Sequence, residues 1–525
     1  MSQPIRTRFA PSPTGYMHIG GMRTALFNWL FAKANGGTFV LRIDDTDQQR
    51  NVEAALEPIL QSFRWLGLNW DEGVEVGGEF GPYYQSQRSE KYQQAVDTLL
   101  EQGKAFRDFD PPALTQQDRE LAEKEKRPFK NIRRSLELTD EQIQQNLTEG
   151  VPHVVRLIVP EDQTIVIDDL IRGRVEFESR LMPDPVIMRN DGSALYNLAT
   201  TVDDHEMQIS HVIRAEEHLS NTPIQVLIAQ ALGWETPIFA HIPYVAAPGG
   251  KQKLSKRKLD KYRKSPQFRK LFDQGDEVLP QIGMSGQEGL DPVMVAFYEA
   301  VGYLPAGLLN ALVRLGWSYD DSTEHFSLQE MIEKFTLDRV VKAPAGFDPD
   351  KLISFQGYWM QQLTLEEKVA GCQAFLQQTQ KPITLPEGAD SDAYLKQLVE
   401  GIGERLVVFS DVLKFNEFLI ADAELTYDPK AFKKRVAKDD QAAAKLKMLS
   451  ESLENCENFS AQGVDQAIHD AAEKAELGMG QIIHVLRVAL TGKAAGIGLF
   501  DAISLLGKAS CLARIAKCIE TIEAS

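Results

Sequence analysis

The sequence predicts an α/β protein whose C-terminal part is helical, and three observations support this fold class. Residues 5–10 alternate in polarity like a strand, apolar residues between Met22 and Leu30 recur at helical spacing, and residues 38–43 are apolar and β-branched. This order of strand, helix and strand predicts a βαβ unit with a right-handed crossover. From about residue 346 onward the apolar pattern is mostly helical.

The predicted βαβ unit carries a breaker-rich cluster after each strand. The first cluster spans residues 10–21 and contains Pro11, Pro13 and Gly15, whereas the second, residues 44–47, is acidic. Gly36 and Gly37 are expected to end the intervening helix. Ligands of parallel α/β sheets bind at the carboxyl ends of the strands, so we expect both clusters to border a ligand site.

The later segments alternate between mixed and helical patterns. After a helical start, residues 88–196 hold a charged, polar run (116–150) and then β-rich pieces at 154–159 and 164–167. Strand-like and helical patterns return at 209–213 and 224–232. In the C-terminal part the pattern is helical at residues 398–409, 439–449 and 482–489.

Length and composition describe an ordinary globular chain. With 525 residues, 43% hydrophobic and 25% charged, the chain is long enough for about three or four domains, and disordered or collagen-like classes are excluded. Subtracting 75 acidic from 57 basic residues gives a net charge of −18, which argues against non-specific coating of nucleic acid. Positive charge is nevertheless concentrated at residues 251–270, which contain ten lysines and arginines and a single acidic residue, Asp260.

The cysteines and the hydropathy pattern argue against a disulfide-rich, secreted or membrane-spanning protein. Four cysteines lie in the last third and form no C-x-x-C pair, so neither a disulfide framework nor a thiolate zinc site is predicted. The first residues lack the apolar run of a signal peptide, and no window is apolar enough to span a bilayer. We expect a soluble cytoplasmic protein that makes no membrane contact.

Two short motifs carry the chemistry. Glycines at 15, 20 and 21 surround His18 at the start of the predicted helix, where backbone N–H groups can bind an anion. Lys253 and Lys256 lie three apart after a glycine-containing loop, a spacing that suits a mobile clamp for phosphates. Taken alone, the first motif is more often a Pro/Gly loop with an incidental histidine, and the second is at least as often a solvated basic stretch.

Together the motifs resemble the two signatures of class I aminoacyl-tRNA synthetases. H-I-G-H corresponds to His18, Ile19, Gly20 and Gly21, and K-M-S-K-S corresponds to Lys253, Leu254, Ser255, Lys256 and Arg257. Further segments are similar to the glutamyl-tRNA synthetases of the bacterial type: Arg8–Gly15, Arg42–Asp47, Asp168–Gly173, Tyr196, Val202–His205, His211–Pro223, Leu486–Gly492 and Leu505–Lys508. They follow the family's order along nearly the whole chain.

The resemblance implies a fold and a domain order. A Rossmann-type catalytic domain would occupy residues 1–87 and 197–258, interrupted by an acceptor-binding α+β domain at 88–196. A stem-contact region (259–345) and an all-α anticodon-binding domain (346–525) would follow. A second basic patch, at 430–438, either contacts tRNA or is a solvated helix face.

The resemblance also implies the substrates and the site residues. The family activates L-glutamate with ATP and Mg²⁺ and transfers it to tRNA(Glu), which implies catalytic roles for His18, Lys256 and, less directly, Lys253. ATP would be bound by Thr14, His18, Gly20, Glu217 and Lys256, and glutamate by Arg8, Ser12, Asp44, Tyr196 and Arg214. Two arginines, Arg8 and Arg214, would pair with the two carboxylates of glutamate. Many relatives have glutamate at the position of Asp44.

Two departures from the family pattern stand out. Many relatives carry a cysteine pair that begins a zinc site just before residue 110, where this chain has Asp108 and Asp110, so we expect no zinc. After the lysine motif the chain continues with Lys258 and about thirty extra residues, an insertion at about 259–292 that either touches tRNA or forms a mobile loop.

Other functions remain to be weighed against this one. A glutaminyl-tRNA synthetase shares the catalytic domain but ends in a β-barrel, which the helical C-terminal pattern disfavours. A catalytically inactive tRNA-binding paralogue is disfavoured by the intact His18, Lys256, Arg8 and Arg214. The shorter relative that glutamylates queuosine in tRNA lacks a C-terminal half, and a small-molecule nucleotidylyltransferase needs no long helical tail. We expect a monomer, and whether tRNA(Gln) is also charged stays open.

Overall fold

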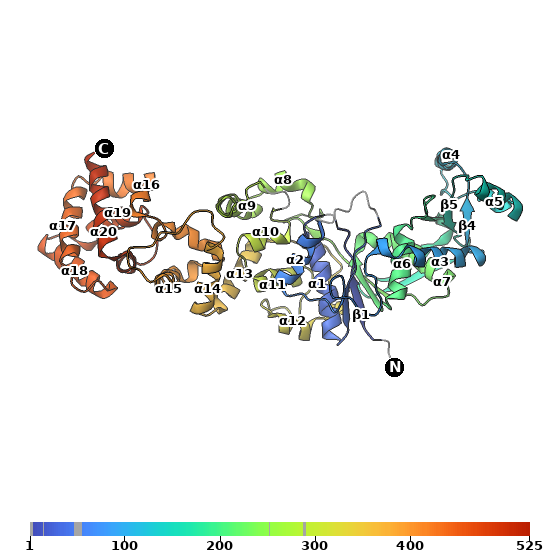
Figure 1. Cartoon of the computed structure of the whole chain (residues 1–525), viewed down its shortest axis with the longest axis horizontal. Coiled ribbons are helices and arrows are strands. Elements are labelled where there is room, and N and C mark those ends of the chain that lie inside the picture. Colours follow the sequence, from blue (N-terminus) through green and yellow to red (C-terminus); the bar gives the residue numbers. More distant parts are fainter. Residues whose placement is uncertain (1–3, 14, 47–54, 251, 287–289, 525) are drawn as a thin grey trace. The chain divides into compact units, whose positions relative to one another are not determined.

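The structure is a computed structural model that describes residues 4–13, 15–46, 55–250, 252–286 and 290–524 (Figure 1). The chain divides into two compact units. Unit 1 holds residues 1–269, 289–297 and 308–351, and unit 2 holds 270–288, 298–307 and 352–525. Within the described ranges, no helix is both long and apolar enough to cross a membrane.

Unit 1 is built on a parallel sheet of five strands in the order β10-β9-β1-β2-β3. The strands are β1 (Arg6–Phe9), β2 (Thr38–Leu41), β3 (Glu72–Gly73), β9 (His211–Ala215) and β10 (Ile238–Ile242). The central strand β1 pairs with β2 on one side and β9 on the other. This confirms the predicted α/β class and the two strands predicted at 5–10 and 38–43.

The helix between β1 and β2, α1 (Ile19–Ala34), packs against β1, β2 and β9. Met22, Leu26 and Leu30 are fully buried, as their spacing predicts. Asn28, which is also buried, donates from Nδ2 to the Ile213 carbonyl at 2.9 Å and fastens α1 to β9. The start of α1 is therefore held at the carboxyl ends of the strands.

The segment between β3 and β9 adds smaller sheets. An antiparallel sheet joins β4 (Ala105–Asp108), β5 (Val154–Leu157) and β8 (Val186–Met188), and β6 (Thr164–Asp169) forms a hairpin with β7 (Gly173–Glu178). Its helices are α3 (Ser89–Glu101), α4 (Pro112–Lys124), α5 (Asp140–Thr148) and α6 (Tyr196–Glu206). The β-rich pieces predicted at 154–159 and 164–167 are confirmed. The sequence predicted no helix in the polar run, where α4 and α5 lie.

The remaining elements of unit 1 complete its core. They are α2 (Leu56–Leu66), α7 (Thr222–Ala231), α8 (Leu259–Arg263), α12 (Leu328–Lys334) and the short parallel pair β11 (Val245–Ala246) and β12 (Ala345–Gly346). Phe335, just after α12, packs edge-on against Phe27 of α1. The boundary between the units crosses α9 (Pro266–Val278), α10 (Val295–Ala300), α11 (Pro305–Val313) and α13 (Pro349–Gln362).

The regular elements of unit 2 are helices, with no strand among its described residues, as the pattern after residue 346 predicts. Its helices are α14 (Leu365–Leu376), α15 (Ser391–Ile402), α16 (Pro429–Phe432), α17 (Ala442–Glu454), α18 (Ala461–Lys474), α19 (Met479–Thr491) and α20 (Leu499–Glu523). Helix α20 packs against α17, α18 and α19 and supplies the buried side chains of Ile503 and Ile515.

Candidate active site

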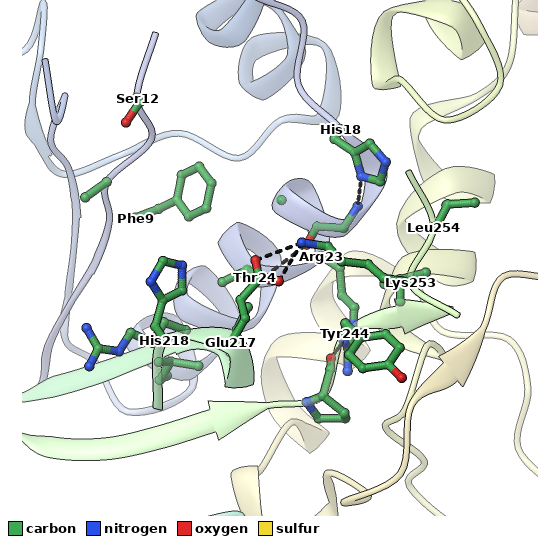
Figure 2. Close-up of a pocket in the computed structure, with 18 of the residues that line it drawn as sticks. Phe9, Ser12, His18, Arg23, Thr24, Glu217, His218, Tyr244, Lys253 and Leu254 are labelled. Carbon is green, nitrogen blue, oxygen red and sulfur yellow. Dashed lines mark hydrogen bonds and ion pairs between the residues drawn. The ribbon is translucent and has the colours of Figure 1, made fainter. Parts of the chain in front are cut away.

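A cleft of about 490 Å³ lies at the carboxyl ends of β1 and β9 (Figure 2). It collects most of the predicted site residues from distant parts of the sequence: Arg8, Ser12, His18, Gly20, Gly21, Asp44, Tyr196, Arg214, Glu217, Lys253, Leu254, Ser255 and Lys256. Ile19 and Arg257 do not line it. Thr14 lies outside the described residues.

His18 caps α1 and presents one ring nitrogen as a donor. Its Nδ1 accepts the Gly20 backbone N–H at 3.0 Å, so the ring proton is on Nε2. Nε2 is buried and has no hydrogen-bond partner among the described residues. Burial, reinforced by the charge of Lys253, lowers the pKa of His18 to about 4. At neutral pH the imidazole is therefore neutral, with one unused N–H.

The lysine motif lies on a turn that returns to β11. The Leu254 N–H donates to the Val245 carbonyl at 2.8 Å, and the buried Leu254 side chain anchors the segment. Figure 2 shows Lys253 and Glu217 reaching toward each other, and their ion pair measures 2.6 Å. Lys256 begins the short 3₁₀ turn η6 (Lys256–Lys258) at the cleft wall. Both lysines of the motif thus face the cleft that contains His18.

A buried chain of charges holds Arg8 and Asp44. Arg8 donates from Nε and Nη2 to the two carboxylate oxygens of Asp204, each at 3.1 Å. Arg42, which is fully buried, donates to Asp204 and to Asp44, each at 2.8 Å. Burial raises the pKa of Asp44 to about 6, although the neighbouring Arg42 opposes this rise. Arg8 is thus neutralised within the protein, whereas Asp44 has one carboxylate oxygen that accepts no hydrogen bond from the described residues.

Arg214 differs from Arg8 in having neutral partners. It is only 5% exposed, and it donates from Nε to His241 Nε2 at 3.1 Å and from Nη2 to Thr222 Oγ1 at 2.7 Å. Among the residues that the structure describes, no carboxylate lies within ion-pair distance of its guanidinium, and Nη1 has no hydrogen-bond partner. Burial lowers the pKa of Arg214, and the nearby Tyr196 partly offsets this. An anion entering the cleft would be its counterion.

Sequence reasoning missed four polar residues that line the cleft: Arg23, Thr24, His218 and Tyr244. Arg23 lies on the apolar face of α1, and its Nε and Nη2 atoms have no hydrogen-bond partner within the described part of the chain. An arginine inside an apolar helical stripe was the available signal. Burial lowers the pKa of His218 to about 4, so this ring is also neutral at pH 7. Nothing in the local sequence distinguished His218 or Tyr244.

The cleft therefore combines unused N–H donors and cationic side chains with two carboxylates, those of Asp44 and Glu217. This arrangement suits a polyanion bound next to a smaller zwitterion. No group of three or more potential metal-ligating side chains occurs in the described ranges. A parallel sheet with a histidine-capped helix N-terminus at its carboxyl edge and a lysine loop opposite is typical of nucleotide-binding enzymes of the Rossmann-type class.

Comparison with known proteins identifies the class. The family "tRNA synthetases class I (E and Q), catalytic domain" matches residues 4–286 and 281–354, and the family "Anticodon binding domain" matches residues 369–519. The glutamate–tRNA ligase of Moorella thermoacetica is 40% identical over 97% of both chains, and that of Halalkalibacterium halodurans is 40% identical over 97% of this chain and 98% of that one.

The chain is also similar in fold to a solved structure of a glutamate tRNA ligase. The crystal structure of a glutamate tRNA ligase from Elizabethkingia meningosepticum, in complex with its amino acid, has a TM-score of 0.84 and 34% identity and covers 99% of this chain and 100% of that one. The chain belongs to the glutamate–tRNA ligases of this class I family. These enzymes are ligases that form an aminoacyl-tRNA.

Proposed function

We propose that the cleft activates L-glutamate with ATP and then transfers the glutamyl group to the terminal adenosine of tRNA(Glu). In the first step an oxygen of the glutamate carboxylate attacks the α-phosphorus of ATP, and the bond to pyrophosphate breaks. That carboxylate is already ionised at neutral pH, so the step needs no general base. Catalysis then rests on positioning and on stabilising the charge of the phosphate oxygens.

The phosphate roles follow from the two motifs. His18 Nε2–H, which is buried and unused, is proposed to donate to an oxygen of the α-phosphate. Lys256 is proposed to stabilise the leaving pyrophosphate, with Lys253 as a second cation on the same turn. Gly20 and Glu217 would border the nucleotide. The family pattern gives Thr14, which lies outside the described residues, the same ATP-binding role. Magnesium would arrive as part of the nucleotide complex.

The observation that supports the proposal most strongly concerns glutamate binding: Arg214 is buried, and no carboxylate of the described residues lies within ion-pair distance of it. A buried guanidinium without a counterion favours a substrate that brings a carboxylate, and it disfavours a neutral amide such as glutamine. Arg8, Ser12 and Tyr196 line the same cleft and would complete the contacts. Asp44, with its remaining oxygen, would hold the α-ammonium group.

We also propose that no zinc is bound and that the domains divide as the sequence predicts. The carboxylates that stand at the family's zinc position are engaged by arginines: Arg156 donates to Asp108 at 2.5 Å, and Arg134 donates to Asp110 at 2.8 Å. Carboxylates already neutralised by arginine are poor ligands for a borderline-soft metal. The basic stretch and the C-terminal helices would contact tRNA, and we propose that the enzyme acts as a monomer in the cytoplasm.

Amino-acid activation separates this proposal from its alternatives. ATP–pyrophosphate exchange, measured with and without tRNA(Glu), is expected to depend on glutamate and to be weak with glutamine. R214A is expected to cost about 2–5 kcal/mol in glutamate kcat/KM because the substrate carboxylate loses its partner. Exchange that prefers glutamine, or an R214A variant with normal glutamate kinetics, would overturn the assignment. Charging assays on tRNA(Glu) and tRNA(Gln) establish which acceptors are used.

A further inference from the structure

We propose that Asp169 and His241 are positioning residues that aim the Arg214 guanidinium without neutralising it, by fixing the tautomer of the His241 ring. The three side chains form a buried hydrogen-bonded chain, Asp169–His241–Arg214, that ends in the cleft. This inference rests on the proposed role of Arg214 in binding the glutamate carboxylate.

Geometry defines the direction of each hydrogen bond in the chain. Arginine Nε–H can only donate, so His241 Nε2, 3.1 Å away, must be the unprotonated acceptor. The proton of the neutral ring is then on Nδ1, which lies 2.6 Å from Asp169 Oδ2 and donates to it. Thr222 Oγ1, also 3.1 Å from Nε2, accepts from Arg214 Nη2 and can donate to the same ring nitrogen.

Asp169 is itself held rigidly by backbone donors. It lies at the end of β6, in the turn to β7, and its Oδ1 accepts from the N–H groups of Ile171 at 2.9 Å and Arg172 at 2.8 Å. Its Oδ2 accepts from the His241 backbone N–H at 3.0 Å. His241 is completely buried on β10, directly opposite Arg214 of β9 in the parallel register. The chain therefore has little freedom to adopt another arrangement.

Arg8 and Arg214 differ in the group that orients each guanidinium. Arg8 is oriented by a carboxylate, Asp204, and is neutralised by the same contact. Arg214 is oriented by a neutral ring, and the carboxylate that fixes this ring stays one residue further away. The positive charge of Arg214 is left for the substrate. A carboxylate at position 241 would instead compete with glutamate for the guanidinium.

The variant D169N tests the tautomer argument with little change in shape. The carbonyl oxygen of the introduced side-chain amide can keep the contacts of Oδ1 with the N–H groups of Ile171 and Arg172 and, at 3.2 Å, with the backbone N–H of His241. Its N–H₂ group then replaces Oδ2, faces His241 Nδ1 and forces the ring proton onto Nε2. Two N–H donors, Nε2 of His241 and Nε of Arg214, then face each other. We expect the glutamate KM to rise about 10- to 100-fold, as outer partners of binding residues typically show, with the ATP KM within about twofold of wild type.

The double variant D169N/H241Q supplies a rescue. A glutamine amide can turn its carbonyl oxygen toward Arg214 whichever group occupies position 169, so the double variant should have a lower glutamate KM than D169N alone. D184N, which alters another buried, ion-paired aspartate, is the control for the general cost of this substitution and should leave the glutamate KM unchanged. The ¹⁵N shifts of His241 should report Nδ1–H in wild type and Nε2–H in D169N.

Several results would overturn the inference. These are an unchanged glutamate KM in D169N, an equal rise of the glutamate and ATP KM values together with a lower melting temperature, or no improvement on adding H241Q. Failure of the inference is distinguishable from failure of the proposed function. If R214A raises the glutamate KM and D169N does not, only the positioning role is disproved. If R214A has no effect, the glutamate-binding assignment itself fails.

Discussion

His18 and His241 are both neutral imidazoles, and in each a neighbouring group decides which nitrogen donates. The Gly20 N–H occupies Nδ1 of His18 and leaves Nε2–H for a ligand, whereas Asp169 accepts Nδ1–H of His241 and leaves Nε2 as an acceptor for Arg214. Burial lowers the pKa of both rings, so neither gains a proton near neutral pH. The same side chain therefore serves as a donor at one site and an acceptor at the other.

Removal of the His18 ring should act on the chemical step. In H18A the transition state loses a preorganised donor, and we expect kcat for ATP–pyrophosphate exchange to fall about 10²–10³-fold. Glutamate affinity, measured by calorimetry, should change little. H469A, which removes an exposed histidine of α18, is the matched control and should behave like wild type. An H18A enzyme with normal turnover would contradict the phosphate role.

Asp44 makes glutamate binding sensitive to pH. Its pKa in the free enzyme is raised to about 6, so the carboxylate is charged above this pH and becomes protonated as the pH falls through it. An ammonium group binds the charged form, so the glutamate KM should be constant above pH 7 and rise below about pH 6. D44N should have a high KM with no such rise. The check is the glutamate KM of both enzymes between pH 5 and 8; a flat wild-type profile contradicts the assignment.

At the scale of elements, the βαβ unit was predictable because its strands and helix are each defined by a local apolar pattern. The polar helices α4 and α5 were not, since few of their side chains are buried: Ala122 in α4 and none in α5. A hydrophobic stripe, the main sequence signal for a helix, is therefore missing. The capping box of Thr139 and Gln142 was the signal that could have located the start of α5.

In the turn between α1 and β2, a methyl group is expected to destabilise the protein more at Gly37 than at Gly36. A Cβ on Gly37 would lie 2.3 Å from the Ile5 carbonyl oxygen, a contact that backbone must move to relieve. Gly36 has a φ of 62° and nothing within 4 Å of its Cβ position. G37A should lower the free energy of unfolding by about 3 kcal/mol, the upper end for overpacking, because the contact is with backbone. G36A, with backbone strain alone, should cost about 1–2 kcal/mol. Thermal or urea unfolding compares them, and a G37A protein more stable than G36A would contradict this packing.

For the whole molecule, the charge distribution decides how an acidic protein binds RNA. The net charge is −18, yet lysines and arginines are concentrated in residues 251–270. Lys261 and Lys264 are exposed on and just after α8. Phosphate contacts release counterions, so their contribution to affinity weakens as salt rises. The basic stretch thus offers positive charge at the lysine motif and directly after it.

The double variant K261A/K264A tests this stretch. We expect the tRNA KM to rise and the slope of log KM against log salt to become shallower by about 0.7–0.9 for each phosphate that is no longer neutralised. The glutamate and ATP KM values should stay as in wild type because neither lysine lines the cleft. K396A, which removes an exposed lysine of α15, is the control. An unchanged tRNA KM and salt slope would exclude these lysines from RNA binding.

The sequence by itself determined the α/β class, the helical C-terminal part, the family and most of the residues that line the cleft, because local periodicity and ordered motifs are written along the chain. Tertiary structure alone decided the protonation and charge state of those residues. Arg8 is neutralised by Asp204, 196 positions away, and Arg214 keeps its charge behind His241, 27 positions away. The His18 tautomer is set locally by the Gly20 N–H, but the neutral state of the ring depends on burial and on the distant Lys253. Burial and hydrogen-bond partners set these states, and both arise only when distant strands pack together.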